Sequence, residues 1–417
     1  MSDSTHGIAR SNSGGNRDRV ISMWCLGRLG KFGNQLFQYG FLRIYAKLHD
    51  LEVETPGWIG ERLFGFRDPS PARNRVPAVD AWIRYYARRR EFGVFALLDL
   101  VRWIRESWPS EVEWIEFDER ILSPECDPLE DVNFWGTFLF PTRYYSPHKA
   151  YFRSLYKPLP EIESKLKPMV DRLRGKGRTL VGIQLRRGDF WQFPDCSLGF
   201  IAPASWYVRW LEEVWREQTD PVLLICSDEP EKVRHEFARF NPLTAADLDN
   251  DTLREMADAG FGFYPDFYLL SQCDVLGISS CSFALVAAML NERCNRFFRP
   301  DAEVGKLVQF DPWDTEVYAD RVDHAQISTV FRRAAYRWRN LKRMGAAHGK
   351  LTLMRNALPR LHRRLSFELA AVLASGFMKS MLIVNRVSKR WRGKSVSPLD
   401  VFTSDRLLRF FTGKFNK

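Results

Sequence analysis

The 417-residue sequence contains no C-x-x-C pair, and its seven cysteines stand singly, at positions 25, 126, 196, 226, 273, 281 and 294. An odd number of scattered cysteines is not the pattern of a disulfide framework or of a zinc ribbon. The first twenty residues are polar and lack the apolar core of a secretory signal peptide. We therefore expect a reducing, cytoplasmic environment and a disordered leader over residues 1–20.

Long uninterrupted apolar runs and internal repeats are also absent. No period of 20 to 50 residues recurs, which argues against solenoids and propellers. The most apolar stretch, residues 367–384, is interrupted by Glu368 and Lys379, so it is at best marginal as a membrane-spanning helix. Neither G-x-G-x-x-G nor the phosphate loop G-x-x-x-x-G-K-[ST] occurs near the N-terminal glycines.

Charge is present in excess but unevenly distributed. Residues 331–417 carry 21 basic and 3 acidic groups, a net charge of +18, whereas residues 1–330 have a net charge of −7. Such asymmetry is typical of a chain in which one segment meets a polyanion, either nucleic acid or an anionic membrane. The basic tail could equally pack on the acidic body, and both interpretations remain open.

Hydrophobic patterning predicts two α/β regions. An apolar run over residues 21–26, a glycine-containing loop and a helix with an apolar stripe at Phe37, Phe41, Ile44 and Leu48 form the first. Apolar runs over 179–185, 221–226 and 275–278 alternate with helical segments in the second. This alternation predicts a parallel sheet covered on both faces, in which ligands bind at the carboxyl ends of the strands.

The glycine loop carries the first candidate residues. Gly33, Asn34 and Gln35 lie where a strand gives way to a helix, so backbone N–H groups there could face an anionic ligand. Asn34 could instead cap the helix. Spacing alone does not separate the two interpretations.

The strongest polar motif is Arg186-Arg187-Gly188-Asp189, directly after a predicted strand. Planar guanidinium groups suit bidentate recognition of a diphosphate, with no metal required. An ion pair between Arg187 and Asp189 at the surface is the alternative.

Polar clusters also follow the other two apolar runs, Ser227-Asp228-Glu229 after residues 221–226 and a serine-rich segment after residues 275–278. Ser279-Ser280-Cys281-Ser282 opens a helix, where its hydroxyls could bind phosphate or cap the helix. Asp266 could accept two hydrogen bonds from a guanine edge or cap its own helix. The acidic run from Asp247 to Asp251 fails as a calcium loop because its sixth position is Thr252 rather than glycine, so we expect a solvated loop and no metal site.

Together the motifs resemble the α-1,2-fucosyltransferases of bacteria and animals, glycosyltransferase family 11. Gly30-Lys-Phe-Gly-Asn-Gln-Leu-Phe-Gln-Tyr39 is similar to the family's G-R-F-G-N-Q-x-F-Q-Y, and Gln184-Leu-Arg-Arg-Gly-Asp189 to its H-x-R-R-G-D. Asp266-Phe-Tyr-Leu-Leu-Ser-Gln-Cys-Asp274, running on to Ser282-Phe283, is similar to its D-x-x-x-L-S-x-C-D helix and serine-rich segment. The resemblance covers about residues 21–300.

The resemblance implies a GT-B-like fold of two Rossmann-like domains facing a cleft. The composition of residues 331–417, which lie outside the resemblance, predicts a basic helical extension. The chain would then consist of a leader (1–20), an acceptor-side domain (21–170), a GDP-sugar-binding domain (171–330) and a basic amphipathic tail (331–417). The resemblance further implies inverting, metal-independent transfer of fucose from GDP-fucose to O2 of a galactose in a glycan or lipid-linked glycan, with no cofactor.

The resemblance also implies roles for individual residues. Arg186 would bind the β-phosphate and stabilise its departure, and Asn34 would lie near the reacting sugar. The residues expected to bind the donor are Gln184, Arg187, Asp189, Asp266, Ser282 and Phe283, and Gly33 and Gln35 would belong to the acceptor-side loop. No residue stands out as a general base.

Gln184 replaces the histidine usual in the family, which keeps a second interpretation open, a glycosyltransferase that uses another nucleotide sugar. A third is a non-catalytic protein whose basic tail binds membrane or nucleic acid. Polar clusters at three strand ends argue against this non-catalytic interpretation, and nucleic acid is the less favoured partner. For residues 331–417 we expect peripheral contact with the cytoplasmic face of a membrane.

Overall fold

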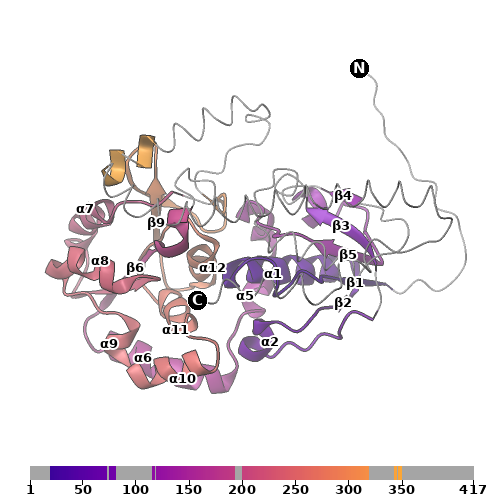
Figure 1. Ribbon diagram of the computed structural model, residues 1–417, viewed down its shortest axis with the longest axis horizontal. Coiled ribbons are helices and arrows are strands. Elements are labelled where there is room, and N and C mark those ends of the chain that lie inside the picture. The colour runs from indigo at the N-terminus through magenta and orange to yellow at the C-terminus, as the bar shows by residue number, and fades with distance from the viewer. Residues whose placement is uncertain are drawn as a thin grey trace, which may run out of the picture.

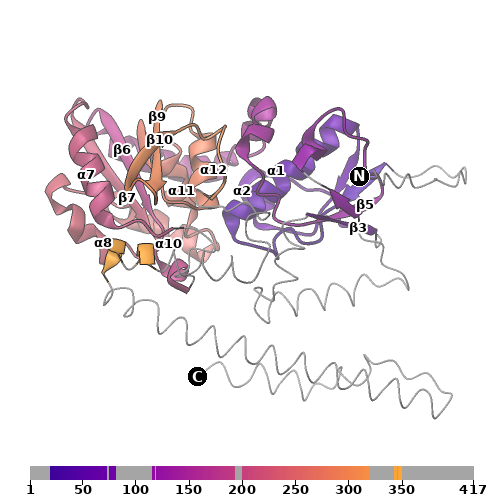
Figure 2. The same ribbon diagram turned by 90° about the horizontal axis from the view of Figure 1, so that it is seen from above.

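The computed structural model describes residues 19–72, 75–80, 115–117, 119–192, 200–318, 342–344 and 346–349. Within them the chain forms two α/β lobes that lie side by side, the N-terminal lobe in indigo and purple and the C-terminal lobe in magenta and orange (Figures 1 and 2). Each lobe contains one sheet of five strands. The predicted fold class, α/β with two Rossmann-like units, is confirmed.

The N-terminal sheet is parallel throughout, with strand order β2-β1-β5-β3-β4. Its strands are β1 (Val20–Ser22), β2 (Glu52–Glu54), β3 (Val76–Asp80), β4 (Ile115–Phe117) and β5 (Val132–Trp135). Its helices are α1 (Phe32–His49) and α2 (Ile59–Phe64). The first strand is shorter than the apolar run predicts, because the chain turns after Ser22 into the glycine loop.

Helix α1 is buried around most of its circumference rather than along one stripe. Phe41 stacks on Phe138 with ring centroids 4.1 Å apart and meets Phe134 edge-on at 5.1 Å. At its N-terminal end α1 also packs against α12 (Ser282–Leu290) of the other lobe. A helix that is apolar on several faces is what such a position between two layers requires.

The C-terminal sheet has the order β10-β9-β8-β6-β7. Its strands are β6 (Thr179–Leu185), β7 (Pro221–Ser227), β8 (Val275–Gly277), β9 (Arg296–Asp301) and β10 (Lys306–Phe310). All pairs are parallel except β9 with β10. Strands β6, β7 and β8 match the predicted apolar runs, whereas β9 and β10 were not predicted, because alternating charged and aromatic residues there hide the pattern.

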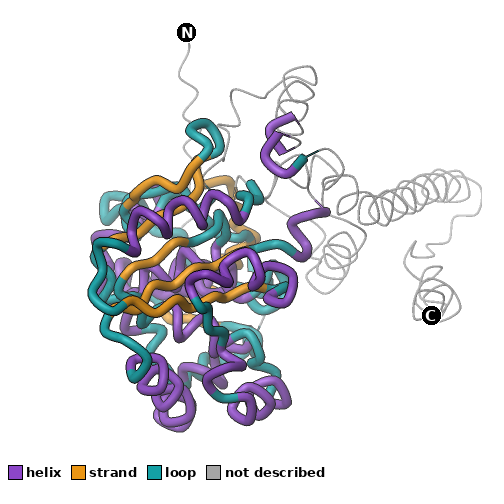
Figure 3. The backbone as a smooth tube through the Cα atoms, turned by 90° about the vertical axis from the view of Figure 1, so that its left-hand side faces the viewer, coloured by secondary structure: helices purple, strands orange, loops and turns teal. Residues whose placement is uncertain are grey.

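Helices cover both faces of this sheet, as the end-on view in Figure 3 shows. They are α6 (Pro160–Arg174), α7 (Ala204–Trp215), α8 (Pro230–Val233), α9 (Ala245–Leu248), α10 (Asn250–Asp258) and α11 (Tyr264–Leu270), besides α12, while α5 (Lys149–Ser154) lies on the connection between the lobes. Short 3₁₀ turns include Glu119–Leu122, Thr142–Tyr144, Ser146–His148, Gly188–Gln192 and Arg234–Phe240.

The predicted leader and most of the predicted basic tail lie outside the described residues. The described part of the tail, residues 342–344 and 346–349, packs on the C-terminal lobe, where Met344 is buried and Arg343 pairs with Glu303 at 3.0 Å. No helix in the described ranges is long and apolar enough to cross a membrane.

Candidate active site

A pocket of about 1430 Å³ lies between the two lobes. Its N-terminal wall comes from the glycine loop, the start of α1 and residues 57–62. Its C-terminal wall comes from the carboxyl ends of β6 and β7, the first turns of α11 and α12, and Tyr318. The polar clusters therefore meet where parallel α/β sheets bind ligands.

The structure brings nearly all the predicted site residues to this pocket. Those that line it are Gly33, Asn34, Gln35, Gln184, Arg186, Asp189, Asp266, Ser282 and Phe283. Arg187 is the exception, because its side chain turns into the lobe behind the loop and is 6% exposed.

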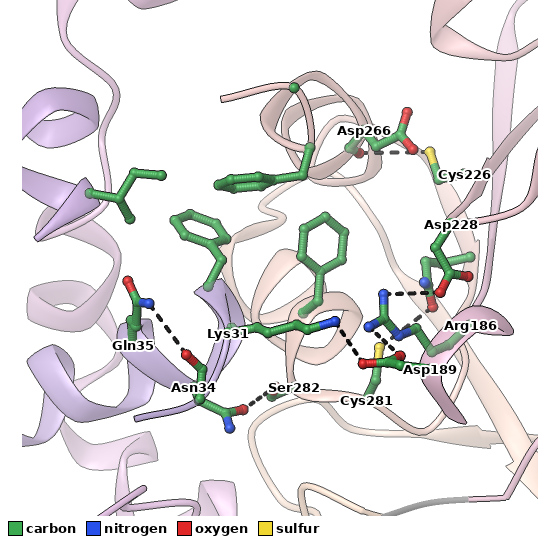
Figure 4. A pocket seen from close by; sticks show the side chains of 18 of the residues that line it. Lys31, Asn34, Gln35, Arg186, Asp189, Cys226, Asp228, Asp266, Cys281 and Ser282 are labelled. Atoms are coloured by element: carbon green, nitrogen blue, oxygen red, sulfur yellow. Dashed lines mark hydrogen bonds and ion pairs between the residues drawn. The ribbon is translucent and has the colours of Figure 1, made fainter. Parts of the chain in front are cut away.

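The first turns of α1 and α12 meet backbone to backbone. A Cβ atom on Gly33 would lie 2.4 Å from the backbone nitrogen of Phe283, so no residue with a side chain fits there without moving one helix. One residue further on, the Ser282 hydroxyl donates to Asn34 Oδ1 at 2.5 Å (Figure 4). Asn34 thus joins the lobes, and the alternative that it caps α1 is wrong, since the N-cap is Lys31.

A second contact crosses the pocket between charged groups. Lys31 Nζ, from the N-terminal wall, lies 2.6 Å from Asp189 Oδ2, and Arg186 Nη2 binds the other oxygen of the same carboxylate at 2.5 Å (Figure 4). Burial acts to raise the pKa of Asp189, but the hydrogen bond from Lys31 and the charge of Arg186 outweigh it and the pKa is lowered. Two cations, one from each lobe, therefore share one carboxylate.

Arg186 is held from a second side by Asp228, which follows β7. Arg186 Nη1 lies 3.2 Å from Asp228 Oδ2, and Asp228 Oδ1 accepts the backbone N–H of Arg187 at 2.8 Å. Gly188 makes this possible, because a Cβ atom there would lie 2.4 Å from Asp228 Oδ2. Burial acts to lower the pKa of Arg186, yet the carboxylates of Asp189 and Asp228 raise it above its ordinary value, so the group stays cationic.

Arg187 occupies a different environment. Its Nη1 donates to the carbonyl of Arg186 at 3.1 Å, and its Nη2 has no hydrogen-bond partner among the described residues. Burial lowers the pKa of this guanidinium. The suggested surface ion pair with Asp189 is wrong, because Asp189 pairs with Arg186 and Lys31 instead.

Gln184 sits at the base of the pocket, where its Oε1 accepts hydrogen bonds from the Ser279 hydroxyl and from Cys281 Sγ, the latter at 3.6 Å. Ser279 Oγ also accepts the backbone N–H of Arg186 at 3.3 Å. The serine-rich turn therefore fixes both the strand end and the side chain that replaces the family's histidine. No described residue accepts a hydrogen bond from Gln184 Nε2.

Asp266 lies in the first turn of α11, on the opposite side of the C-terminal wall from Asp189 (Figure 4). Burial raises the pKa of its carboxyl to about 7, and a hydrogen bond from the Cys226 thiol offsets this only in part. Its side chain does not cap α11, whose N-cap is Phe263. A carboxyl with this pKa can change between acceptor and donor near neutral pH.

Aromatic rings close the pocket between these polar groups. Phe32, at the start of α1, packs against Phe263 at 4.7 Å and Phe267 at 5.1 Å, and Phe283 packs against Phe267 at 5.3 Å. Gln35 lies beside this cluster with its Oε1 buried and without a partner among the described residues.

The acidic run at residues 247–251 has a structural role. Asp247 forms a capping box with Thr244, and Asp249 caps α10 by accepting the backbone N–H of Thr252 at 2.9 Å. No cluster of three or more histidine, cysteine or acidic side chains able to hold a metal ion occurs in the described ranges.

Sequence reasoning placed Asp228 in a polar cluster at a strand end without naming it as a site residue, and it missed Lys31. The sequence position of Asp228 indicated the site, because Asp228 directly follows β7 and Arg186 directly follows β6. These two strands are parallel neighbours, so their carboxyl ends lie side by side. The position of Lys31 gave no such indication beyond its place in the glycine loop, since its partner lies 158 residues away.

No family model matches the chain, and no curated protein matches its sequence. Solved structures similar to it include the fucosyltransferase NodZ from Bradyrhizobium, at 12% identity and a TM-score of 0.41 over 71% of this chain and 99% of that one. A mutant of Arabidopsis thaliana FUT1 in complex with GDP has 12% identity and a TM-score of 0.41, over 77% of this chain and 81% of that one. POFUT1 in complex with GDP has 12% identity and a TM-score of 0.40, over 67% of this chain and 96% of that one. Identities and TM-scores of this size assign neither a family nor a reaction.

Proposed function

We propose that the protein is an inverting fucosyltransferase that moves fucose from GDP-fucose to O2 of a galactose in a glycan or lipid-linked glycan, without a metal ion. The observation that carries the proposal is Arg186. Its guanidinium faces a pocket between two α/β lobes, is kept charged by two carboxylates, and has a second cation, Lys31, opposite it.

This arrangement suits departure of a nucleoside diphosphate. When the bond between the sugar and the β-phosphate breaks, negative charge grows on the phosphate oxygen, and a preorganised cation stabilises that charge. Arg186 supplies it from β6, and Lys31 would exchange Asp189 for the phosphate. The positive groups thereby take the part that a divalent ion has in other nucleotide-sugar enzymes.

The rest of the C-terminal wall fits a guanine nucleotide. An ionised Asp266 accepts two hydrogen bonds from the N1 and N2 donors of guanine, whereas uracil offers only one N–H donor on its pairing edge. Ser282 and Phe283 open α12 beside the diphosphate, and Arg187 supports the loop from behind rather than touching the donor. Asn34, Gln35 and Gly33 belong to the acceptor wall.

A second donor remains a candidate because of Gln184. Its Oε1 is engaged by Ser279 and Cys281, which leaves its amide nitrogen for the ligand, and an amide N–H serves the carbonyl of uracil as well as that of guanine. Turnover with a UDP-sugar alone would remove Asp266 as the base-reading residue.

The deciding experiment is calorimetric binding of GDP, with GMP and UDP as controls, in EDTA. We expect GDP to bind the wild-type chain, GMP to bind more weakly because it lacks the β-phosphate, and UDP hardly at all. Arg186→Ala should lose about 2–3 kcal/mol of GDP affinity, the range of a charge-assisted contact. No GDP binding by folded wild-type protein would overturn the proposal and favour the non-catalytic interpretation.

Turnover then tests the finer claims. GDP-fucose, GDP-mannose and UDP-sugars are compared with a galactoside acceptor, and the product linkage and anomeric configuration are read by NMR. Transfer to a position other than O2 would leave the donor assignment standing and correct the acceptor.

A further inference from the structure

We propose that Glu61 is the general base that takes the proton from the acceptor hydroxyl. This inference rests on the glycosyl transfer proposed above and deepens it, since it assigns the proton that must leave the nucleophile. It starts from the carboxylates of the pocket.

Among the residues that the structure describes, four carboxylates line the pocket: Glu61, Asp189, Asp228 and Asp266. Asp189 and Asp228 are both bound to Arg186, and a carboxylate so paired is a poor proton acceptor. Asp266 lies beside Cys226 on the C-terminal wall, where it is engaged in nucleotide recognition under the proposed function. Three of the four therefore belong to the wall that holds the leaving group.

Glu61 alone among these four comes from the N-terminal wall. It lies in α2, one turn before Phe64, whose ring packs against Phe32 at 6.4 Å and so ties α2 to the start of α1. The acceptor must enter from this side, because an inverting displacement needs the nucleophile on the face of the sugar opposite the departing phosphate. Glu61 stands on the side of the nucleophile.

The carboxylate of Glu61 is also free to accept a proton. No described residue forms an ion pair or a side-chain hydrogen bond with it. The adjacent cation, Arg62, turns away to the carbonyl of Ala259 at 2.8 Å and the ring of Phe261 at 4.5 Å. Both Glu61 oxygens lie on the side of Gly57, where a Cβ atom would be 3.9 Å from each, and both residues line the pocket.

The acceptor O–H gives its proton to Glu61 as its oxygen forms a bond to the anomeric carbon. The bond from that carbon to the β-phosphate oxygen breaks, and its electron pair leaves on GDP beside Arg186. Glu61 then returns the proton to water.

The test compares Glu61→Gln with wild type, using GDP-fucose and phenyl β-D-galactoside. General acid–base catalysis contributes roughly 10²- to 10⁴-fold, so we expect kcat to fall at least about 100-fold while GDP affinity stays within about twofold of wild type. Glu161→Gln, the same change in the first turn of α6 and outside the pocket, should behave as wild type.

A second variant separates proton transfer from acceptor binding. Azide is a nucleophile that needs no base, so sodium azide should restore turnover of Glu61→Ala and form a fucosyl azide. A variant in which only the KM for the galactoside rises would make Glu61 an acceptor-binding residue and overturn the proposal. If Glu61→Gln turns over at the same rate as wild type, the assignment of Glu61 as general base is overturned while the proposed function stands. Wild-type protein that binds no GDP would overturn the proposed function instead.

Discussion

Asp266 is the residue whose chemistry is most directly set by its surroundings. Burial raises the pKa of its carboxyl to about 7, and only the ionised form can accept two hydrogen bonds from guanine. GDP affinity should therefore increase about tenfold from pH 6 to pH 8, about fivefold of it by pH 7, and level off above pH 8. Calorimetry of GDP binding across this range checks it, with Asp266→Asn as the reference that retains only the titration of the phosphates. In Asp266→Asn this rise in GDP affinity between pH 6 and pH 8 should vanish. If the rise persists, a group other than Asp266 causes it.

The same raised pKa has a consequence for stability in the absence of ligand. Because the folded-state pKa exceeds that of the unfolded chain, Asp266 favours folding below pH 4, and this contribution is lost as the pH rises towards 7 and beyond. Asp266→Asn should thus gain stability relative to wild type between pH 5 and pH 8, by about 1–3 kcal/mol. Urea unfolding of both proteins at pH 5 and pH 8 measures this gain. If the difference in free energy of unfolding between variant and wild type is the same at both pH values, burial does not raise the pKa of Asp266 as described.

At the scale of elements, the junction of α1 with α12 decides whether the two walls meet. Gly33→Ala would place a Cβ atom 2.4 Å from the Phe283 backbone, so the helices must separate and the Asn34–Ser282 bond must lengthen. We expect a loss of about 2 kcal/mol or more in the free energy of unfolding, together with weaker GDP binding. Gly175→Ala is the control, since that glycine has a right-handed helical conformation and ordinary contacts of 3.4 Å. Wild-type stability of Gly33→Ala would contradict the packing described.

A second element, residues 346–349, braces the loop that carries Arg186. The His348 ring packs edge-on against Trp191 at 5.1 Å, and its Nε2 binds the carbonyl of Ile201. Burial, with a smaller contribution from Arg187, lowers the pKa of His348 to about 4. Stability from this histidine is therefore present above pH 6.5 and lost as the pH falls to about 4.

We expect His348→Gln to flatten the loss of stability between pH 6.5 and pH 4, because an amide can bind the Ile201 carbonyl but does not titrate. Thermal unfolding monitored by circular dichroism at pH 4.5, 5.5 and 6.5 checks this. An identical pH dependence in wild type and variant would place the titration elsewhere.

At the scale of the whole molecule, the separation of charge predicts contact with an anionic surface. Residues 331–417 carry a net charge of +18 and residues 1–330 a net charge of −7. Residues 342–344 and 346–349 pack on the C-terminal lobe, so the informative deletion is residues 351–417. Full-length protein should float with vesicles containing phosphatidylserine and be released by salt, whereas the truncated chain should not float. Equal flotation would favour packing of the tail on the body.

The sequence by itself determined the α/β class, the strands β6, β7 and β8, and the positions of Arg186 and Ser282 at one edge of a sheet. It did so because strand pattern and turn chemistry are local, and because the carboxyl ends of parallel strands must meet. Only the tertiary structure decided that Asp228 holds Arg186 from a second side, since this contact depends on the path of the loop. It also decided that Lys31 reaches Asp189 and that Asn34 meets Ser282, 248 residues apart, since these contacts exist only once two separately patterned lobes have packed together.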